Sequence, residues 1–399
     1  MKILLVHRYF YPDSPPYASI LLEIARRLIQ DGHEVEVLTS FPSYKSTSSQ
    51  VKVPESETID GIQVRRIKLL KEEKNVSIKK LINIFYFPLR VFVYLLFNRR
   101  IDSVMCSTAP AVFMGFFTAL GAKLIKADFK YHCMDIHPEI GNISGEFKNP
   151  LVFKILKAMD SWTCKQAQNI IVLSSDMKAS LISRCAGLTN IHEINNFALP
   201  EQEKAFEESY QNFLREKNVF RVIFAGNIGR FQNLESFIQA MKQLSSFSNI
   251  ELVFVGEGSA LSNLKEKANH LSLKNIKFFP HQPIFVARAL MRDANLGIVS
   301  LNKDIYKYAF PSKTMTYLEE GCPILLTVES ESSISDMVVK NKLGVQATPD
   351  DPHSIAEAIL KMYQSNQVDS EIRKKAQQFI SENFSQTDIL NKWTKLFSV

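Results

Sequence analysis

The sequence predicts two α/β domains, each a parallel sheet covered by helices on both faces. Short apolar runs alternate with helical patterns from end to end, which is typical of parallel strands buried between helices. The chain has 399 residues, and because domains usually hold about 100–200 residues, this length indicates two of them. A polar and acidic stretch from Phe197 to Asn218 interrupts the alternation, and we expect the linker there.

In the first half, we expect strands at the apolar runs Ile3–Val6, Val35–Thr39, Val64–Leu69, Val104–Ser107, Phe129–Met134 and Ile170–Leu173. Helices fill the intervals between them. Ser14 can cap the first helix, and Pro15 fits its first turn. The apolar stripe of this helix, from Leu21 to Leu28, ends before Gly32. This is the strand-then-helix start of a nucleotide-binding fold without the usual glycine-rich loop.

In the second half, we expect strands at Val222–Ala225, Leu252–Val255, Ile276–Phe279, Leu296–Val299 and Ile324–Thr327. The helices between and after them begin near Leu234, Leu261, Ile284 and Ser312. The chain ends on Ile389–Phe397, whose apolar residues recur at helical spacing. Such an amphipathic helix must dock on another surface of the protein.

Composition excludes several classes of protein. The apolar content of 46% and the charged content of 22% are ordinary for folded domains, so we expect neither disorder nor a solenoid. The five cysteines lack C-x-x-C spacing, which favours reduced thiols in a cytosolic compartment. The apolar run before His7 is too short for a signal peptide, so we do not expect secretion.

The positive charge of the chain lies in its first half. Residues 1–200 hold 25 basic and 18 acidic residues and so carry the whole net charge of +7. This excess suits an anionic membrane surface or a phosphate-bearing acceptor, and a merely solvated basic surface is the alternative. Nucleic acid is not an expected partner, because no recognised binding motif accompanies the charge.

Two glycine-containing loops follow strands of the second half. The first, Gly226-Asn227-Ile228-Gly229-Arg230, comes before the helix near Leu234, where backbone N–H groups and the helix terminus can bind a phosphate. Arg230 would add charge-assisted hydrogen bonds. The second, Gly256-Glu257-Gly258-Ser259, would project from the same sheet edge. The alternative is a pair of tight turns in which glycine serves the backbone alone.

Further polar groups lie at Pro311-Ser312-Lys313, which precedes a helix. Ser312 could cap that helix and Lys313 could reach a diphosphate, although a solvent-exposed lysine is an equal alternative.

In the first half, the segment from Tyr131 to Glu139 ends a buried strand with Asp135, His137 and Glu139. Enzymes with parallel sheets gather reactive groups at such strand ends. For Asp135 we favour a functional role, whereas we interpret His132 as a core or surface histidine whose hydrogen bonds are satisfied.

Other site chemistries lack their defining residues. His132, Cys133 and His137 have no second ligand cluster at metal spacing, so we expect no metal site. The sequence also lacks G-x-S-x-G, G-K-[ST] and a complete G-x-G-x-x-G, which removes serine hydrolases, P-loop enzymes and simple dinucleotide enzymes from consideration. We expect no cofactor.

The stretch Ile78–Phe97 is apolar but interrupted by charged and helix-breaking residues, so we do not expect it to span a membrane. Basic, aromatic and aliphatic residues together instead favour a segment lying in a membrane interface. The expected contacts are Lys79, Lys80, Arg90, Phe92 and Leu95. The alternative is two helices packed on the core of the first domain.

Taken in order, several of these motifs resemble the family 4 retaining glycosyltransferases, particularly the bacterial branch that builds colanic acid, O-antigen and capsule polysaccharides. The resemblance runs nearly end to end. It is carried by Tyr9-Phe10-Tyr11-Pro12-Asp13, Gly32-His33-Glu34-Val35, Asp135-Ile136-His137-Pro138-Glu139, Gly226-Asn227-Ile228-Gly229, Val255-Gly256-Glu257-Gly258, Pro311-Ser312-Lys313 and Gly321-Cys322-Pro323.

The resemblance implies the GT-B fold, in which two facing Rossmann-like domains are joined by a C-terminal crossover helix. Residues 1–200 would bind the acceptor and residues 201–385 the nucleotide sugar, with the helix at 386–399 packing back on the first domain. The implied partners are a nucleotide-sugar donor, with a UDP-sugar favoured, and a lipid-linked glycan acceptor. The enzyme would act without a metal, with retention, in the cytoplasm at the inner face of the membrane.

The resemblance also implies roles for single residues. Arg230 and Lys313 would contact the diphosphate, and Asp135 would be the acceptor-side carboxylate, with His137 and Glu139 beside it. The other donor-binding residues would be Gly226, Asn227, Gly229, Gly256, Glu257, Ser312 and Thr316.

This chain departs from the family at two positions. Relatives carry two glutamates eight positions apart, where this chain has Tyr308 and Thr316. Glu319 and Glu320 on the same helix are not simple substitutes. Two alternatives to transfer therefore stay open. One is an inactive scaffold of a polysaccharide assembly complex, and the other is a nucleotide-sugar epimerase, which would form product from the donor alone.

Overall fold

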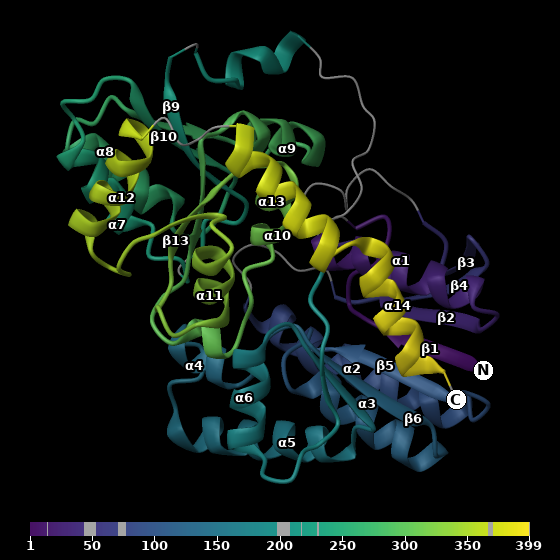
Figure 1. Cartoon of the computed structure of the whole chain (residues 1–399). Coiled ribbons are helices and arrows are strands. Elements are labelled where there is room, and N and C mark those ends of the chain that lie inside the picture. Colours follow the sequence, from purple (N-terminus) through teal and green to yellow (C-terminus); the bar gives the residue numbers. More distant parts are fainter. Residues whose placement is uncertain are drawn as a thin grey trace. The chain divides into compact units, whose positions relative to one another are not determined.

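The computed structural model describes residues 1–13, 15–43, 53–70, 77–197, 208–216, 218–229, 231–365 and 370–398. The chain forms two compact units (Figure 1). Unit 1 comprises Met1–Asn195, Tyr308–Phe310 and Thr387–Val399, and unit 2 comprises Asn196–Lys307 and Pro311–Gln386. The inclusion of Tyr308–Phe310 in unit 1 was not expected from the sequence.

Unit 1 is built on an eight-stranded sheet of order β3-β4-β2-β1-β5-β6-β7-β8. Its strands are β1 (Lys2–Val6), β2 (Glu34–Ser40), β3 (Ser56–Ile59), β4 (Ile62–Ile67), β5 (Ser103–Ser107), β6 (Asp128–Cys133), β7 (Asn169–Val172) and β8 (Ile191–Glu193). All neighbours pair in parallel except β3 and β4. The edge strands β3 and β8 were not predicted, because they are short and lack an apolar run.

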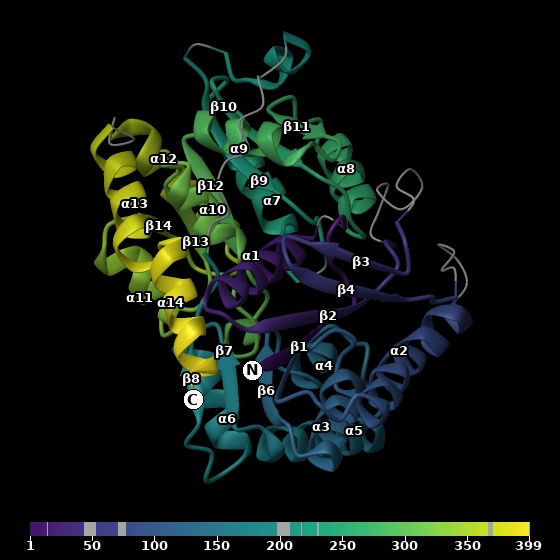
Figure 2. The same ribbon diagram turned by 90° about the vertical axis from the view of Figure 1, so that its right-hand side faces the viewer.

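The helices of unit 1 are α1 (Pro16–Gln30), α2 (Ser77–Phe97), α3 (Phe113–Ile125), α4 (Glu139–Ile143), α5 (Pro150–Gln166), α6 (Ser175–Arg184) and α14 (Gln386–Phe397). Helices α2, α3 and α5 lie side by side (Figures 1 and 2). The predicted cap Ser14 lies outside the described residues, and α1 begins at Pro16 after an N-cap at Pro15.

The C-terminal helix α14 docks on strand β6. The Trp393 ring lies 4.9 Å from the ring of His132, and Lys130 Nζ lies 4.6 Å from the centroid of Phe397. His132 is buried, and its Nδ1 is 2.8 Å from the hydroxyl of Tyr17. His132 is therefore a core histidine, although its buried Nε2 has no hydrogen-bond partner among the described residues.

Helix α2 rules out the alternative of two separate helices, because one continuous helix accommodates Pro88. One side packs on the core through Phe87, Val91 and Leu95, all fully buried. The expectation that Leu95 contacts a membrane is therefore wrong, because its side chain fills the space beside Gly121 of α3. No helix among the described residues is long and apolar enough to cross a membrane.

Unit 2 contains a six-stranded parallel sheet of order β11-β10-β9-β12-β13-β14. Its strands are β9 (Phe220–Ala225), β10 (Ile250–Val255), β11 (Ile276–Phe279), β12 (Leu296–Ser300), β13 (Ile324–Thr327) and β14 (Gly344–Gln346). Its helices are α7 (Glu235–Gln243), α8 (Leu261–His270), α9 (Ile284–Asp293), α10 (Lys313–Glu319), α11 (Ser333–Lys340), α12 (Pro352–Gln364) and α13 (Ser370–Asn383). Helices α7, α8 and α12 form one neighbouring set, and α9, α10 and α13 form another (Figure 2).

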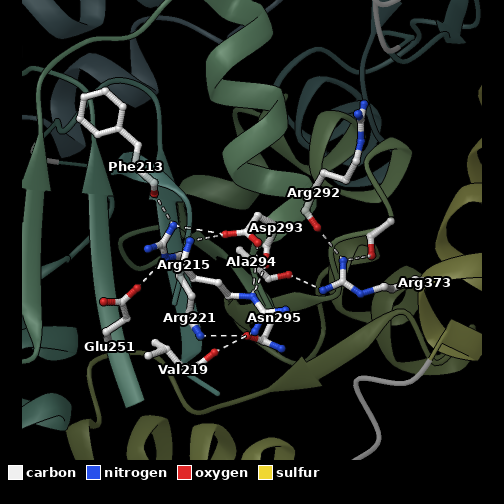
Figure 3. A network of polar contacts seen from close by, with 11 residues as sticks. Phe213, Arg215, Val219, Arg221, Glu251, Arg292, Asp293, Ala294, Asn295 and Arg373 are labelled. Carbon is white, nitrogen blue, oxygen red and sulfur yellow. Dashed lines mark hydrogen bonds and ion pairs between the residues drawn. The ribbon is translucent and has the colours of Figure 1, made fainter. Parts of the chain in front are cut away.

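A network of ion pairs closes the amino edge of this sheet (Figure 3). Arg221 at the start of β9 is buried and donates to Glu251 of β10 at 2.6 Å. Asp293 accepts from Arg221 at 3.4 Å and from the backbone N–H of Arg215 at 2.7 Å. Arg373 of α13 donates to carbonyl groups at the end of α9 and after α10. Charged groups here therefore stabilise the sheet and the carboxyl ends of two helices.

Candidate functional site

The topology of each sheet marks a place for a ligand. In parallel sheets, ligands bind outside the carboxyl ends of strands where the order of strands reverses direction. In unit 2 this reversal lies between β9 and β12, and in unit 1 between β1 and β5. The loops after β9 and β12 are joined, because Asn302 N donates to Phe231 O at 2.7 Å.

Lys313 is the main polar group at the switch point of unit 2. Its Nζ is buried, lies 3.4 Å from the centroid of the Phe224 ring on β9, and has no hydrogen-bond partner among the described residues. A Cβ built on Gly226 would lie 3.9 Å from this nitrogen. Burial lowers the pKa of Lys313 to about 7, because an unpaired ammonium is costly away from water. An anion placed beside Gly226 would remove that cost.

The glycines after β9 and β10 allow two loops to touch. A Cβ on Gly256 would lie 2.0 Å from Gly226 O, and one on Gly258 would lie 2.2 Å from Ile228 O. Both glycines also have positive φ angles, +140° and +158°. Packing therefore accounts for Gly256 and Gly258, while the loop they support brings the exposed Gly226 and Asn227 to the edge.

The loop offers fewer backbone donors than the sequence predicted. The amide of Gly226 donates to Val255 O, that of Ile228 to Glu257 O at 2.8 Å, and that of Gly229 to Gln232 Oε1 at 3.0 Å. The helix terminus is also absent from the loop, because α7 begins only at Glu235. Arg230 lies outside the described residues.

The remaining predicted donor residues lie around α10. Ser312 occupies the N-cap position, but its side chain caps no amide, so that expectation is wrong. Thr316 is half-buried one turn into the helix. Glu319 and Glu320 are paired with Arg288, whose guanidinium lies 2.6 Å from Glu319, so their carboxylates are already occupied.

At the carboxyl edge of unit 1, Asp135 follows β6. Its backbone forms an isolated bridge with Ala309, and the amide of Ile136 donates to Tyr308 O at 2.7 Å. Its carboxylate makes no hydrogen bond or ion pair with another residue of the described part of the chain. Burial raises the pKa of Asp135 to about 6, so the carboxylate is ionised at neutral pH and is basic enough to accept a proton.

His137 and Glu139 differ from each other. His137 is half-buried, and its Nδ1 is buried without a hydrogen-bond partner among the described residues. Burial, followed by the charge of Arg184, lowers the pKa of His137 to about 4. Glu139, in contrast, pairs with Arg184 at 3.0 Å and Lys157 at 3.6 Å, so it is not open to an acceptor as the sequence predicted.

Sequence reasoning missed the groups at the switch point of unit 1. His7 follows β1, and its Nδ1 contacts the hydroxyl of Ser107 at the end of β5. Burial, followed by the charge of Arg8, lowers the pKa of His7 to about 3, so its ring is neutral. The position of His7 directly after a buried strand was the signal that could have revealed it. Among the described residues, no group of His, Cys, Asp or Glu side chains has the arrangement of a metal site.

Two family models match adjacent parts of the chain. Residues 18–202 match the model described as Glycosyltransferase Family 4, and residues 205–379 match the model described as Glycosyl transferases group 1. These matches bear out the family resemblance seen in the motifs.

Two curated proteins are similar in sequence. The putative colanic acid biosynthesis glycosyl transferase WcaI of Escherichia coli is 24% identical over 84% of this chain and 86% of its own length. The probable glycosyltransferase WbjE of Pseudomonas aeruginosa is 24% identical over 65% of this chain. The latter match covers 66% of WbjE, just under two thirds of its length.

Solved glycosyltransferase structures share the fold. Anabaena Alr3699/HepE in complex with UDP and glucose superposes with a TM-score of 0.71 at 17% identity, covering 100% of each chain. WaaG, a glycosyltransferase involved in lipopolysaccharide biosynthesis, has a TM-score of 0.69 at 14% identity, covering 99% of each chain. At these identities the similarity concerns the fold alone, and it confirms the predicted GT-B class.

Proposed function

We propose that this chain, which belongs to the GT-B glycosyltransferases with a Family 4 and a group 1 domain, transfers a sugar from a nucleotide-sugar donor to a lipid-linked glycan. Unit 2 binds the donor, and unit 1 binds the acceptor. A UDP-sugar is the donor we favour, since HepE structures hold UDP or UDP-glucose. The name of WcaI supports a role in building a surface polysaccharide.

The observation that carries the proposal is the unpaired Lys313 Nζ beside Gly226 at the switch point of unit 2. A diphosphate bound there would accept hydrogen bonds from Lys313 and from the backbone amide of Asn227, for which the described part of the chain shows no acceptor. As the glycosidic bond breaks, negative charge grows on the departing diphosphate, and a cation held in place stabilises that charge. Arg230 would add a second cation. Retention and independence of a metal rest on the family resemblance.

On the acceptor side, Asp135 is the candidate base. Its carboxylate lacks a partner among the described residues, and its raised pKa of about 6 suits proton transfer near neutral pH. The acceptor hydroxyl would pass its proton to Asp135 or to the leaving phosphate as the new glycosidic bond forms.

The membrane part of the proposal rests on the outer face of α2. Large apolar side chains are exposed at every fourth residue of this helix: Leu81 (57%), Phe85 (44%), Leu89 (45%), Val93 (38%) and Phe97 (83%). Helices α3 and α5 also carry exposed apolar residues, which are Leu124, Leu151, Val152 and Ile155. Arg90 lies along this stripe, and Arg99 and Arg100 follow its end, as expected of a surface that meets anionic lipid.

Of the residues expected to contact the membrane, Arg90 is exposed and donates to the Tyr86 hydroxyl at 3.1 Å. Phe92 is half-buried with its ring 6.2 Å from that of Phe117, and Lys79 is half-buried. The side chain of Lys80 lies outside the described part. We therefore propose the stripe from Leu81 to Phe97 as the lipid-facing surface, in the cytoplasm at the inner membrane face.

Donor binding is tested by thermal shift and calorimetry with UDP, GDP, dTDP and CMP, comparing wild type with Arg230→Ala. We expect one nucleotide, UDP, to raise Tm, and the variant to lose that effect. If a folded wild-type protein binds none of the four, donor transfer is contradicted and the inactive scaffold replaces it.

Membrane binding is tested by flotation with anionic and zwitterionic vesicles. The double variant Phe85→Asp, Leu89→Asp should lose binding to anionic vesicles, because two charges replace apolar side chains in the interface. Val339→Asp, which changes a residue 49% exposed on α11 of unit 2, is the matched control and should bind as wild type. Unchanged flotation of the double variant would contradict a lipid surface.

A further inference from the structure

A buried arginine holds the turn that carries His137. Arg184, the last residue of α6, has a side chain only 3% exposed. Its Nη1 donates to the carbonyl oxygen of His137 at 2.9 Å and to Glu139 Oε2 at 3.0 Å. One nitrogen thus contacts both ends of the short turn from His137 to Glu139.

The other side of the same guanidinium is fixed by two groups of α5. Its Nη2 donates to the buried carboxylate of Asp160 on α5 and to Cys164 Sγ at 3.5 Å. Asp160 accepts a second hydrogen bond from the Tyr131 hydroxyl on β6 at 2.7 Å. The turn is therefore connected through Arg184 to α5 and to the core side of β6.

Stability alone does not account for this cluster, because well-packed apolar residues of similar volume often stabilise a core as much as a buried ion pair does. A buried arginine does, however, fix geometry, because its planar guanidinium donates hydrogen bonds in only a few directions. The guanidinium fixes the backbone of His137, two residues after Asp135, and the Nδ1 of the same residue has no described partner. A neutral imidazole, kept so by burial and by Arg184, has one ring nitrogen able to accept a hydrogen bond from a hydroxyl.

We propose that Arg184 is a positioning residue for the acceptor: by clamping the turn from His137 to Glu139, it holds the His137 ring where a sugar hydroxyl of the acceptor can bond to it. The inference rests on the proposed function, since it deepens the acceptor side of that reaction. Arg184 itself touches neither the acceptor nor the donor.

The test compares Arg184→Lys with Arg221→Lys in the full-length protein, using UDP-glucose and a detergent-solubilised polyprenyl-diphosphate disaccharide. Both arginines are buried and each contacts two carboxylates, but Arg221 lies at the amino edge of unit 2. Arg184→Lys should raise the acceptor KM about tenfold, because the lysine ammonium cannot bond to both sides as the planar guanidinium does. The donor KM should stay within about twofold of wild type. Arg221→Lys should change neither constant. The inference would be overturned if Arg184→Lys and Arg221→Lys each changed the acceptor KM and the donor KM by the same factor.

A second variant, Glu139→Gln, and a second measurement, the pKa of His137, test the inference independently. Glu139→Gln keeps the contact between Arg184 and Asp160 and should raise the acceptor KM by a smaller factor. Histidine NMR titration should place the His137 pKa higher in Arg184→Gln than in wild type and leave it unchanged in Arg221→Lys. If wild type transfers no sugar, the proposed function fails on its acceptor, and an unchanged His137 pKa in Arg184→Gln would then overturn the inference separately.

Discussion

The sheet in unit 2 has a paired buried cation at its amino edge and an unpaired one at its carboxyl edge. At the amino edge, Arg221 is 1% exposed and is paired with Glu251 and Asp293. At the carboxyl edge, the buried nitrogen of Lys313 faces the Phe224 ring and has no acceptor among the described residues. A buried cation without an acceptor costs free energy, so the charge of Arg221 is compensated by its carboxylates, whereas the charge of Lys313 destabilises the unit until an anion binds.

Unit 1 repeats the contrast within one turn. Glu139 is held by Arg184 and Lys157, whereas His137 Nδ1 two residues earlier has no described partner. Buried polar atoms without a described partner also occur elsewhere, for example at His132 Nε2 and Arg66 Nε, so the position of Lys313 and His137 at the carboxyl ends of the strands is what assigns them to the candidate site. Proteins commonly trade stability for function at such sites.

Replacing Lys313 should have the largest effect on donor binding. Lys313→Met should weaken UDP binding by about 100-fold, because hydrogen bonds to a charged group contribute about 1.5–3 kcal/mol. The same change should raise the stability of the empty protein, because it removes an unsatisfied buried amine. Calorimetry with UDP and urea unfolding measure the two effects. A variant that loses stability together with affinity would show that Lys313 is part of the structural core.

Raising the pH should have an intermediate effect. The pKa of Lys313 in the empty protein is about 7, and a bound diphosphate favours the protonated form, so binding takes up a proton above that pH. The Kd for UDP-glucose should therefore rise about tenfold between pH 6 and pH 8. Lys313→Arg stays charged throughout and should show little change. An equally steep profile in that variant would assign the titration to another group.

Replacing Arg221, which is paired at the amino edge of the sheet, should have the smallest effect on donor affinity. Arg221→Met leaves Glu251 with Lys277, 2.7 Å away, as its remaining cation, and should lower the free energy of unfolding by about 1–3 kcal/mol. Because the change lies at the far ends of the strands, the UDP Kd at a temperature where the variant is folded should stay within about twofold of wild type. A larger change in the UDP Kd would mean that the two edges are coupled.

The central strands could be predicted from sequence because a parallel strand buried on both faces is a run of apolar residues. The edge strands β3, β8 and β14 could not, since they are short and partly exposed. The sequence left open whether Ile78–Phe97 forms two helices, and the structure has one, in which burial of Phe87, Val91 and Leu95 outweighs the effect of Pro88.

The candidate site could likewise be predicted only in part from the sequence. Asp135 and the glycine loops could be named because they directly follow apolar strands. The burial of Lys313 could not be predicted, because it depends on α10 packing over Phe224, far away in the sequence. Arg184 was missed for the same reason, since its partners precede it by 20 to 47 residues.

The most direct test of the account is the number of protons taken up when UDP-glucose binds at pH 8, measured by calorimetry in two buffers of different ionisation enthalpy. UDP-glucose has no phosphate group that titrates near this pH, so any proton taken up goes to the protein. We expect close to one proton in wild type and none in Lys313→Arg. Binding without proton uptake in wild type, or with equal uptake in both proteins, would contradict the assignment of Lys313 to the donor diphosphate.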